Sequence, residues 1–137
     1  MQGAFHSWKC TEAAGVAIHR AVVQGTNAGE CKYGASANVA GFVGFTDDAQ
    51  GTVDRSVTLQ EAGECFALAY GAVSVGDRCV IGDAAGRVAS AESDIVAAPS
   101  GTAAQYEQVC IARTAAGQTD DVIRVLIAAL LVKKAAT

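Results

Sequence analysis

The sequence is poor in the residues that usually build a catalytic or ligand-binding site. Its 137 residues include one proline, one tryptophan, one methionine and two histidines, and aromatic residues make up only 6%. The apolar half of the composition is mostly Ala and Val, whose small side chains fill thin spaces between sheets. A large cavity lined by aromatic side chains is therefore not expected.

Concentrated positive charge and long apolar segments are also absent. The formal net charge is −4, and Lys133 and Lys134 are the only adjacent pair of basic residues. A nucleic-acid interface needs a basic face, so no nucleic-acid partner is expected. The apolar run 125–132 is shorter than the roughly 20 residues that cross a bilayer. Residues 1–10 carry His6 and Lys9 where a signal peptide has its apolar core. We expect no membrane partner and synthesis in a cytoplasm.

The cysteines form no recognisable metal or disulfide motif. There are five, an odd number, and no CxxC pair occurs. Cys65, Cys79 and Cys110 lie in apolar, strand-like runs, where a free thiol behaves as a small hydrophobic group. We interpret them as buried thiols, with a disulfide framework or a zinc site as the less favoured alternative.

A strand-turn-strand plan occurs twice, at residues 43–60 and 109–127. In each copy a short apolar strand ends at a threonine, Thr46 or Thr114. It is followed by a turn that contains Ala and Gly and by a second strand that is rich in Val. This order is typical of a small antiparallel β-domain.

Glycines recur from Gly15 to Gly117 and separate runs of about five to ten residues, which is strand length. The fold class predicted is all-β, a small antiparallel β-barrel or β-sandwich with an extended N-terminal arm and at most one or two short helices. Residues 66–70 alternate between bulky Phe66, Leu68 and Tyr70 and small alanines. The predicted strands are 16–24, 31–33, 42–46, 53–59, 65–70, 78–81, 87–89, 109–113 and 122–128.

The connections carry recognisable turn residues. Gly76 and the loop 82–87 place Gly and Asp where a turn needs a positive φ or a side chain that bonds its own backbone, so residues 78–89 are a predicted hairpin. Gly44 lies within a strand pattern, where glycine marks a bulge or a close backbone crossing. Residues 97–108 hold the only proline and are predicted as a loop with at most one or two helical turns.

Residues 1–14 follow neither a helical nor a strand period. We predict that they form an arm and that residues 15–137 form a single β-domain. Phe5 and Trp8 either close one end of the barrel or anchor the arm on a partner, since aromatic residues dominate interface hot spots. Together with Lys9 they are candidate partner-contact residues.

Two acidic pairs, Asp47-Asp48 and Asp120-Asp121, lie beside the two repeated turns and are further candidate contacts. Neither pair belongs to the alternating Asp/Asn series of a calcium loop, so no metal site is predicted. The favoured interpretation is solvated turn carboxylates, some of which accept backbone N–H bonds.

Catalysis has little support in the sequence. His6 and His19 are the only histidines, and both the GxSxG elbow and the glycine-rich phosphate loops are absent. An enzyme would need His19 within hydrogen-bond reach of a nucleophile such as Cys31 or Ser56. We therefore predict no enzyme, no catalytic residue and no cofactor.

Three segments, taken in order, carry a resemblance to a known family: GFVGFTDDAQGTV at 41–53, GECFALAYGAVSVGDRCVIGDAAGRVASA at 63–91, and VCIARTAAGQTDDVIRVLI at 109–127. The chain resembles the DUF2190-like capsid cement, or decoration, proteins of tailed phages. The resemblance implies a small β-barrel or sandwich that assembles as a homotrimer. It also implies a location in the virion, on the capsid exterior, where the trimer ties neighbouring major capsid proteins together, and it implies no catalytic residues.

An alternative function uses the same strands. A small β-barrel that binds a ligand such as a carbohydrate would need exposed aromatic rings on one face, and Trp8, Tyr33 and Tyr70 are the candidates for stacking.

Overall fold

Five strands from the N-terminal part of the chain close into a small barrel. The computed structural model describes residues 5–33, 41–49, 53, 55–91 and 105–133. The barrel order is β1-β3-β2-β4-β5, in which β1 and β3 run parallel and the other neighbouring strands run antiparallel. The strands are β1 (Phe5–Cys10), β2 (Ala21–Gln24), β3 (Glu30–Tyr33), β4 (Phe42–Thr46) and β5 (Ser56–Gln60).

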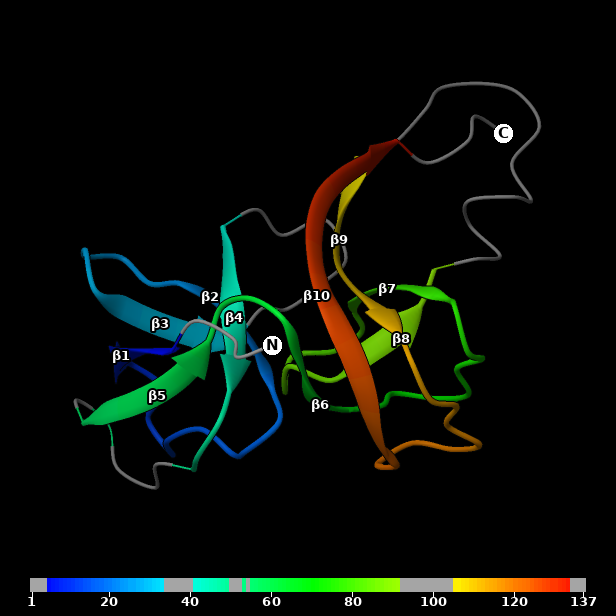
Figure 1. Ribbon diagram of the computed structural model, residues 1–137. Coiled ribbons are helices and arrows are strands. Elements are labelled where there is room, and N and C mark those ends of the chain that lie inside the picture. Colours follow the sequence, from blue (N-terminus) through cyan, green and yellow to red (C-terminus); the bar gives the residue numbers. More distant parts are fainter. Residues whose placement is uncertain (1–4, 34–40, 50–52, 54, 92–104, 134–137) are drawn as a thin grey trace.

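The C-terminal part forms a second, five-stranded antiparallel sheet in the order β6-β10-β9-β7-β8. A bridge between Ala69 and Val88 joins the segment after β6 to β8, so the two edges of the sheet approach each other. Figure 1 shows this sheet, coloured green to red, beside the barrel. Its strands are β6 (Glu64–Leu68), β7 (Arg78–Ile81), β8 (Val88–Ser90), β9 (Gln105–Ala112) and β10 (Val122–Lys133).

The barrel and the sheet share a hydrophobic core. The larger buried cluster combines Phe45 and Val23 of the barrel with Val88, Ile123 and other residues of the sheet. A smaller cluster around Val57 and Leu59 fills the barrel itself. Small side chains dominate both clusters, as the Ala- and Val-rich composition predicts.

The all-β prediction is confirmed, and the described residues contain no helix. Both strand-turn-strand units are antiparallel hairpins, β4–β5 and β9–β10, and residues 78–89 contain the predicted β7–β8 hairpin. Both features expected of a glycine within a strand, a bulge and a close backbone crossing, occur at Gly44. The pairing of β2 with β4 shifts register beside it, and a Cβ there would meet the carbonyl oxygen of Gln60.

The prediction of an extended arm is wrong for Phe5–Cys10. These residues form β1, which pairs along its length with β5 and places Cys10 in the barrel core. The sequence gives no strand period here because β1 is exposed at three successive residues, Phe5, His6 and Ser7, and so has no regular buried face. The barrel needs β1 to close.

The largest other differences from the predicted strands lie at β2 and β9. Residues 16–20 are not part of β2, because His19 adopts a positive φ of 64° and turns the chain. Residues 105–108, predicted as loop, belong to β9, while residues 97–104 lie outside the described part of the chain. The predicted strand 122–128 is confirmed and is longer than predicted, since β10 continues to Lys133.

All five cysteines are buried and none is part of a disulfide bond, which confirms the buried-thiol interpretation. Cys10 lies opposite Cys31 between β1 and β3, and Cys79 lies opposite Cys110 between β7 and β9. Burial raises the pKa of Cys31 to about 12, with smaller contributions from Cys10 and Glu12. The five thiols are packing groups, and the raised pKa makes Cys31 a poor nucleophile at neutral pH.

Candidate functional site

The three candidate contacts of the N-terminal segment are carried by β1. Phe5 is 44% exposed, whereas Trp8 is half-buried against the barrel core and its Nε1 donates to Oε2 of Glu61 at 2.7 Å. Lys9 Nζ lies 4.0 Å from a carboxylate oxygen of Glu30. Trp8 therefore helps to close the barrel, and Phe5 is the aromatic side chain of β1 that remains available to a partner.

The Asp47-Asp48 pair begins the turn from β4 to β5, and both residues are exposed. Asp48 Oδ1 accepts the backbone N–H of Thr58 at 3.0 Å, while the backbone N–H of Asp47 donates to the Thr58 carbonyl at 2.8 Å. Asp48 thus braces the turn. The Asp47 side chain stays on the surface, and its charge adds to the raised pKa of Cys65 and opposes the lowering of the His19 pKa.

The Asp120-Asp121 pair ends the turn from β9 to β10. Asp121 Oδ2 accepts the backbone N–H groups of Gly117 and Gln118, at 2.9 and 3.3 Å. Asp120 has a positive φ of 74° and its Oδ1 accepts a hydrogen bond from Nε of Arg87 at 2.7 Å. The prediction that some of these carboxylates accept backbone N–H bonds is confirmed for Asp48 and Asp121. Whether any of them contacts a partner stays a prediction.

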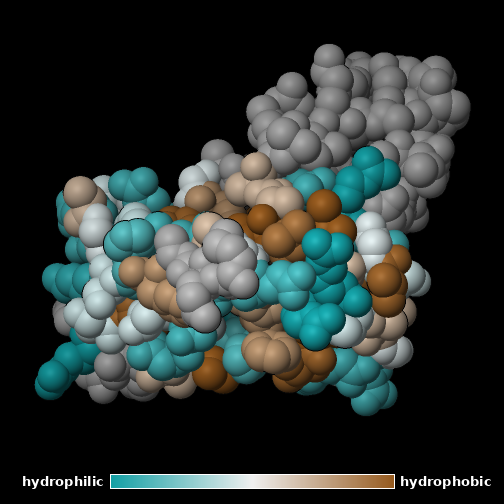
Figure 2. Space-filling model, in the orientation of Figure 1, coloured by the Kyte–Doolittle hydropathy of each residue, from teal (hydrophilic) through white to brown (hydrophobic). Residues whose placement is uncertain are grey.

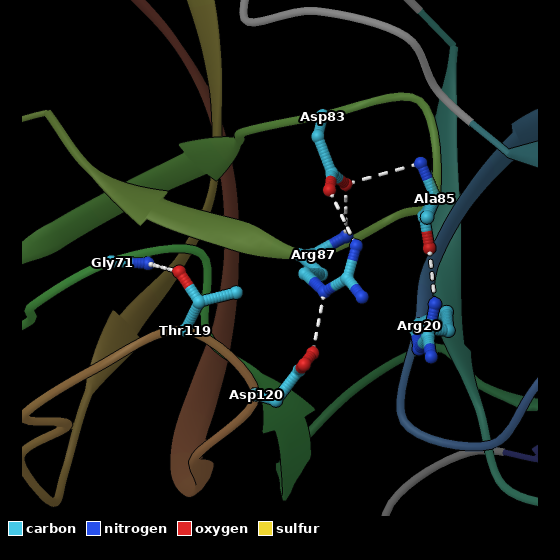
Figure 3. A network of polar contacts seen from close by, with 7 residues as sticks. All are labelled: Arg20, Gly71, Asp83, Ala85, Arg87, Thr119 and Asp120. Atoms are coloured by element: carbon cyan, nitrogen blue, oxygen red, sulfur yellow. Dashed lines mark hydrogen bonds and ion pairs between the residues drawn. The ribbon is translucent and has the colours of Figure 1, made fainter.

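Arg87 joins two loops of the second sheet, an arrangement that the sequence analysis missed (Figure 3). Its Nη1 lies 2.7 Å from Oδ2 of Asp83 in its own hairpin, and its Nε contacts Asp120 of the β9–β10 turn. Asp83 Oδ1 also accepts the backbone N–H groups of Ala85 and of Arg87 itself, both at 3.1 Å. The i, i+4 spacing of Asp83 and Arg87 around Gly86 was a visible signal. The position of Asp120 was not, because it depends on the tertiary fold.

The same hairpin is attached to the barrel. Arg20 Nη1 donates to the Ala85 carbonyl at 2.9 Å, and the backbone N–H of Ala21 donates to the Gly86 carbonyl at 2.8 Å. A Cβ on Gly86, which has a φ of 74°, would lie 2.6 Å from the Ala21 carbonyl oxygen. The loop of the β7–β8 hairpin is therefore the junction between the two sheets (Figure 3).

The charges of this junction stabilise one another. Burial tends to raise the pKa of Asp83, but hydrogen bonds from the Arg87 side chain and from the backbone of Arg87 and Ala85 outweigh it and hold the pKa below its ordinary value of 3.8. A carboxyl group with a lowered folded-state pKa stabilises the fold fully above its unfolded pKa. That stabilisation is lost as the pH falls through the folded-state pKa.

We expect Asp83→Asn to lower the free energy of unfolding at pH 7 by about 1–2 kcal/mol, because the amide loses the charge that Arg87 contacts. The difference from the wild type should shrink as the pH falls below the ordinary pKa of 3.8, and it should disappear below the lower folded-state pKa, where the carboxyl group is protonated in the folded protein as well. Urea titrations at several pH values measure both effects. Asp48→Asn, which changes another N–H-accepting carboxylate, is the matched control. A pH-independent difference for Asp83→Asn would contradict the assignment.

His19 sits where the barrel meets β6. Its ring lies 5.6 Å from the ring of Phe66, its backbone N–H donates to Thr46, and its carbonyl accepts the N–H of Leu68. Burial lowers its pKa, Asp47 opposes that shift and Arg20 adds to it. These contacts tie the barrel to the sheet.

Two of the three aromatic rings considered for ligand stacking are partly buried. Tyr33 packs against the barrel core and its hydroxyl accepts the N–H of Ala17 at 2.7 Å, while Trp8 is held by Glu61. Tyr70 is 49% exposed. A ligand that stacks on aromatic rings could not use the full ring faces of Trp8 and Tyr33, because both are partly buried.

Within the described ranges, no group of three or more His, Cys, Asp and Glu side chains is arranged to hold a metal ion. Across the same residues, no helix is long and apolar enough to span a membrane.

The fold and these contacts define a class, an all-β protein in which a five-stranded barrel and a five-stranded sheet share one core. The solved structures include a similar one, the head fiber gp8.5 N base of bacteriophage phi29. Its TM-score is 0.65 at 12% sequence identity, and the match covers 93% of this chain and 95% of that chain. No protein-family model and no curated protein matches the chain, so the DUF2190-like resemblance has no support from a family model. Identity this low shows a shared fold.

Proposed function

We propose that this chain is a structural protein of a phage head. In this proposal it is a cement or decoration protein that binds the outer surface of the capsid as a homotrimer and links neighbouring major capsid proteins. The observation that carries the proposal is the fold likeness to a phage head fiber base over nearly the whole of both chains. The order of the three segments that resemble phage decoration proteins points to the same class.

The physical character of the described surface supports this role. Asp48 and Asp121 are held by hydrogen bonds to backbone N–H groups, and a side chain that is already held loses little conformational entropy when a partner binds. A repeated lattice of capsid proteins lets several weak contacts per trimer add through multivalency. Exposed carboxylates held in place on a small β-core suit binding to a partner surface better than they suit catalysis.

Co-sedimentation with empty heads tests the proposal. The heads are assembled from the major capsid protein of the same genome, and the purified chain is added in increasing amounts. We expect saturable binding in a fixed ratio to the capsid protein and a higher melting temperature of the decorated heads. An unrelated acidic β-protein of similar size is the control. A chain that never sediments with the heads and leaves their melting unchanged would overturn the proposal.

A further inference from the structure

The outer face of β6 is unusual in the side chains that it exposes. Cys65 and Ala67, the small residues of the strand, point into the core, whereas Phe66 points outward and is 52% exposed. On β10, Val122 is 53% exposed and lies opposite the partly buried Leu68. An antiparallel sheet with one solvated face normally exposes polar residues there. Exposed large apolar side chains on such a face indicate an interaction surface.

A basic flank borders this apolar face. Arg124 lies directly opposite Phe66 on β10, and the backbone N–H of Arg113 donates to the Arg124 carbonyl at 2.8 Å. Both guanidinium groups are directed to one carboxylate, that of Glu64, with Nε to oxygen distances of 3.5 Å for Arg113 and 3.3 Å for Arg124. Two arginines share one glutamate, so this flank carries an excess positive charge on a chain with a net charge of −4.

An acidic flank borders the other side of Phe66. The barrel segment beside β6 is fixed there by the hydrogen bond from Leu68 to the His19 carbonyl, and the His19 ring contacts Phe66. The exposed Asp47 directly follows Thr46, whose carbonyl accepts the His19 N–H, so Asp47 lies on the barrel side of Phe66. Across the strands the surface therefore runs from the Asp47 flank, through Phe66, to the arginine flank.

Figure 2 shows the hydropathy of the surface over the region where β10 crosses the front of the molecule in Figure 1. Brown hydrophobic surface there is interrupted by teal hydrophilic surface. The face thus combines an apolar centre with flanks of opposite charge.

We propose that the outer face of β6 and β10 is the contact between copies of this chain, with the Asp47 flank of one copy against Arg113 and Arg124 of the next and Phe66 between them. This inference rests on the self-assembly proposed above and names the surface that would perform it. The occupant is a second copy because one chain carries both complementary flanks. A contact between two different patches repeats from copy to copy and closes into a ring when the rotation allows it, which fits a trimer.

Charge exchange across the contact is the sharpest test. We expect Asp47→Lys and Arg124→Glu each to raise the dissociation constant of the oligomer at least about tenfold, because each variant places like charges together in the assembly. The double variant, which exchanges the two charges, should regain most of the loss. Lys32→Glu, a reversal of an exposed charge on β3, is the control and should have no effect. Sedimentation equilibrium measures the constants, and circular dichroism verifies that each variant is folded.

The apolar centre is tested in parallel. Phe66→Ser should weaken association by about tenfold or more if Phe66 is an interface hot spot. Val75→Ser is the matched control, because Val75 is an even more exposed apolar residue, at 67%, in the turn before β7.

Several outcomes would overturn the inference while leaving capsid binding intact. They are unchanged association in the single charge variants, failure of the double variant to recover, or a wild-type chain that stays monomeric at high micromolar concentration and on heads. Loss of co-sedimentation of the wild type with heads is a separate failure, and it would remove the proposed function itself.

Discussion

Replacing Gly86 with alanine is expected to lower the free energy of unfolding by about 2–5 kcal/mol, because two costs add at this residue. The first is the backbone, since Gly86 has a φ of 74° and an L-residue is strained there. The second is steric, because the new Cβ would lie 2.6 Å from the carbonyl oxygen of Ala21, where the backbone has little room to move. The clash would also weaken the hydrogen bond from the Ala21 N–H to the Gly86 carbonyl, which joins the barrel to the second sheet. Urea unfolding followed by circular dichroism measures the loss.

Gly76→Ala separates the two costs. Gly76 has a φ of 89°, so alanine is strained there as well, but among the described residues no atom beyond Gly76 and its chain neighbours lies within 4 Å of the position its Cβ would take. We expect Gly86→Ala to exceed Gly76→Ala by about 1–3 kcal/mol, the usual cost of overpacking. Equal losses in the two variants would mean that the junction tolerates the extra methyl group, and the structural role assigned to the β7–β8 loop would be wrong.

The sequence was most informative where local chemistry decides the structure. Gly76, Gly86 and Asp83 predict their turns because a positive φ and a side chain that accepts its own backbone N–H groups are properties of single residues. The β4–β5 and β9–β10 hairpins were predictable for the same reason, since each couples a strand pattern to a turn.

The sequence was least informative where distant partners decide the structure. β1 has no period of its own and is a strand because β5 and β3 offer it hydrogen bonds. The sequence predicted that bulky and small side chains alternate along β6, but the size of a side chain does not determine which face of the strand is buried. The structure buries Cys65 and Ala67 because the space between the sheets is thin, and Phe66 is left outside. No short stretch of sequence predicts the contact of Arg87 with Asp120 or the charged flanks around Phe66, because each of them joins segments that only the fold brings together.

Deletion of residues 1–10 is expected to abolish cooperative folding of the barrel. The deletion removes five residues of β1 that pair in register with β5, from Phe5 opposite Gln60 to Lys9 opposite Ser56. It would expose Val57 and Leu59, which are now almost completely buried, and would remove Cys10 from the barrel core. An open edge on β5 is also a template for aggregation. An N-terminal segment that served only as an arm would instead leave the melting temperature unchanged.

Thermal unfolding by circular dichroism and the denaturant m-value of the truncated chain test this expectation. Because m scales with the surface exposed on unfolding, loss of the barrel should reduce m, or should leave no cooperative transition at all. Phe5→Ala is the matched control. It changes β1 at a side chain that is 44% exposed, keeps the strand, and should cost well under the loss from the deletion. A truncated chain with the wild-type melting temperature and m-value would show that β1 is dispensable. Contact with a partner would then be the role of Phe5, Trp8 and Lys9, since the barrel would not need them to close.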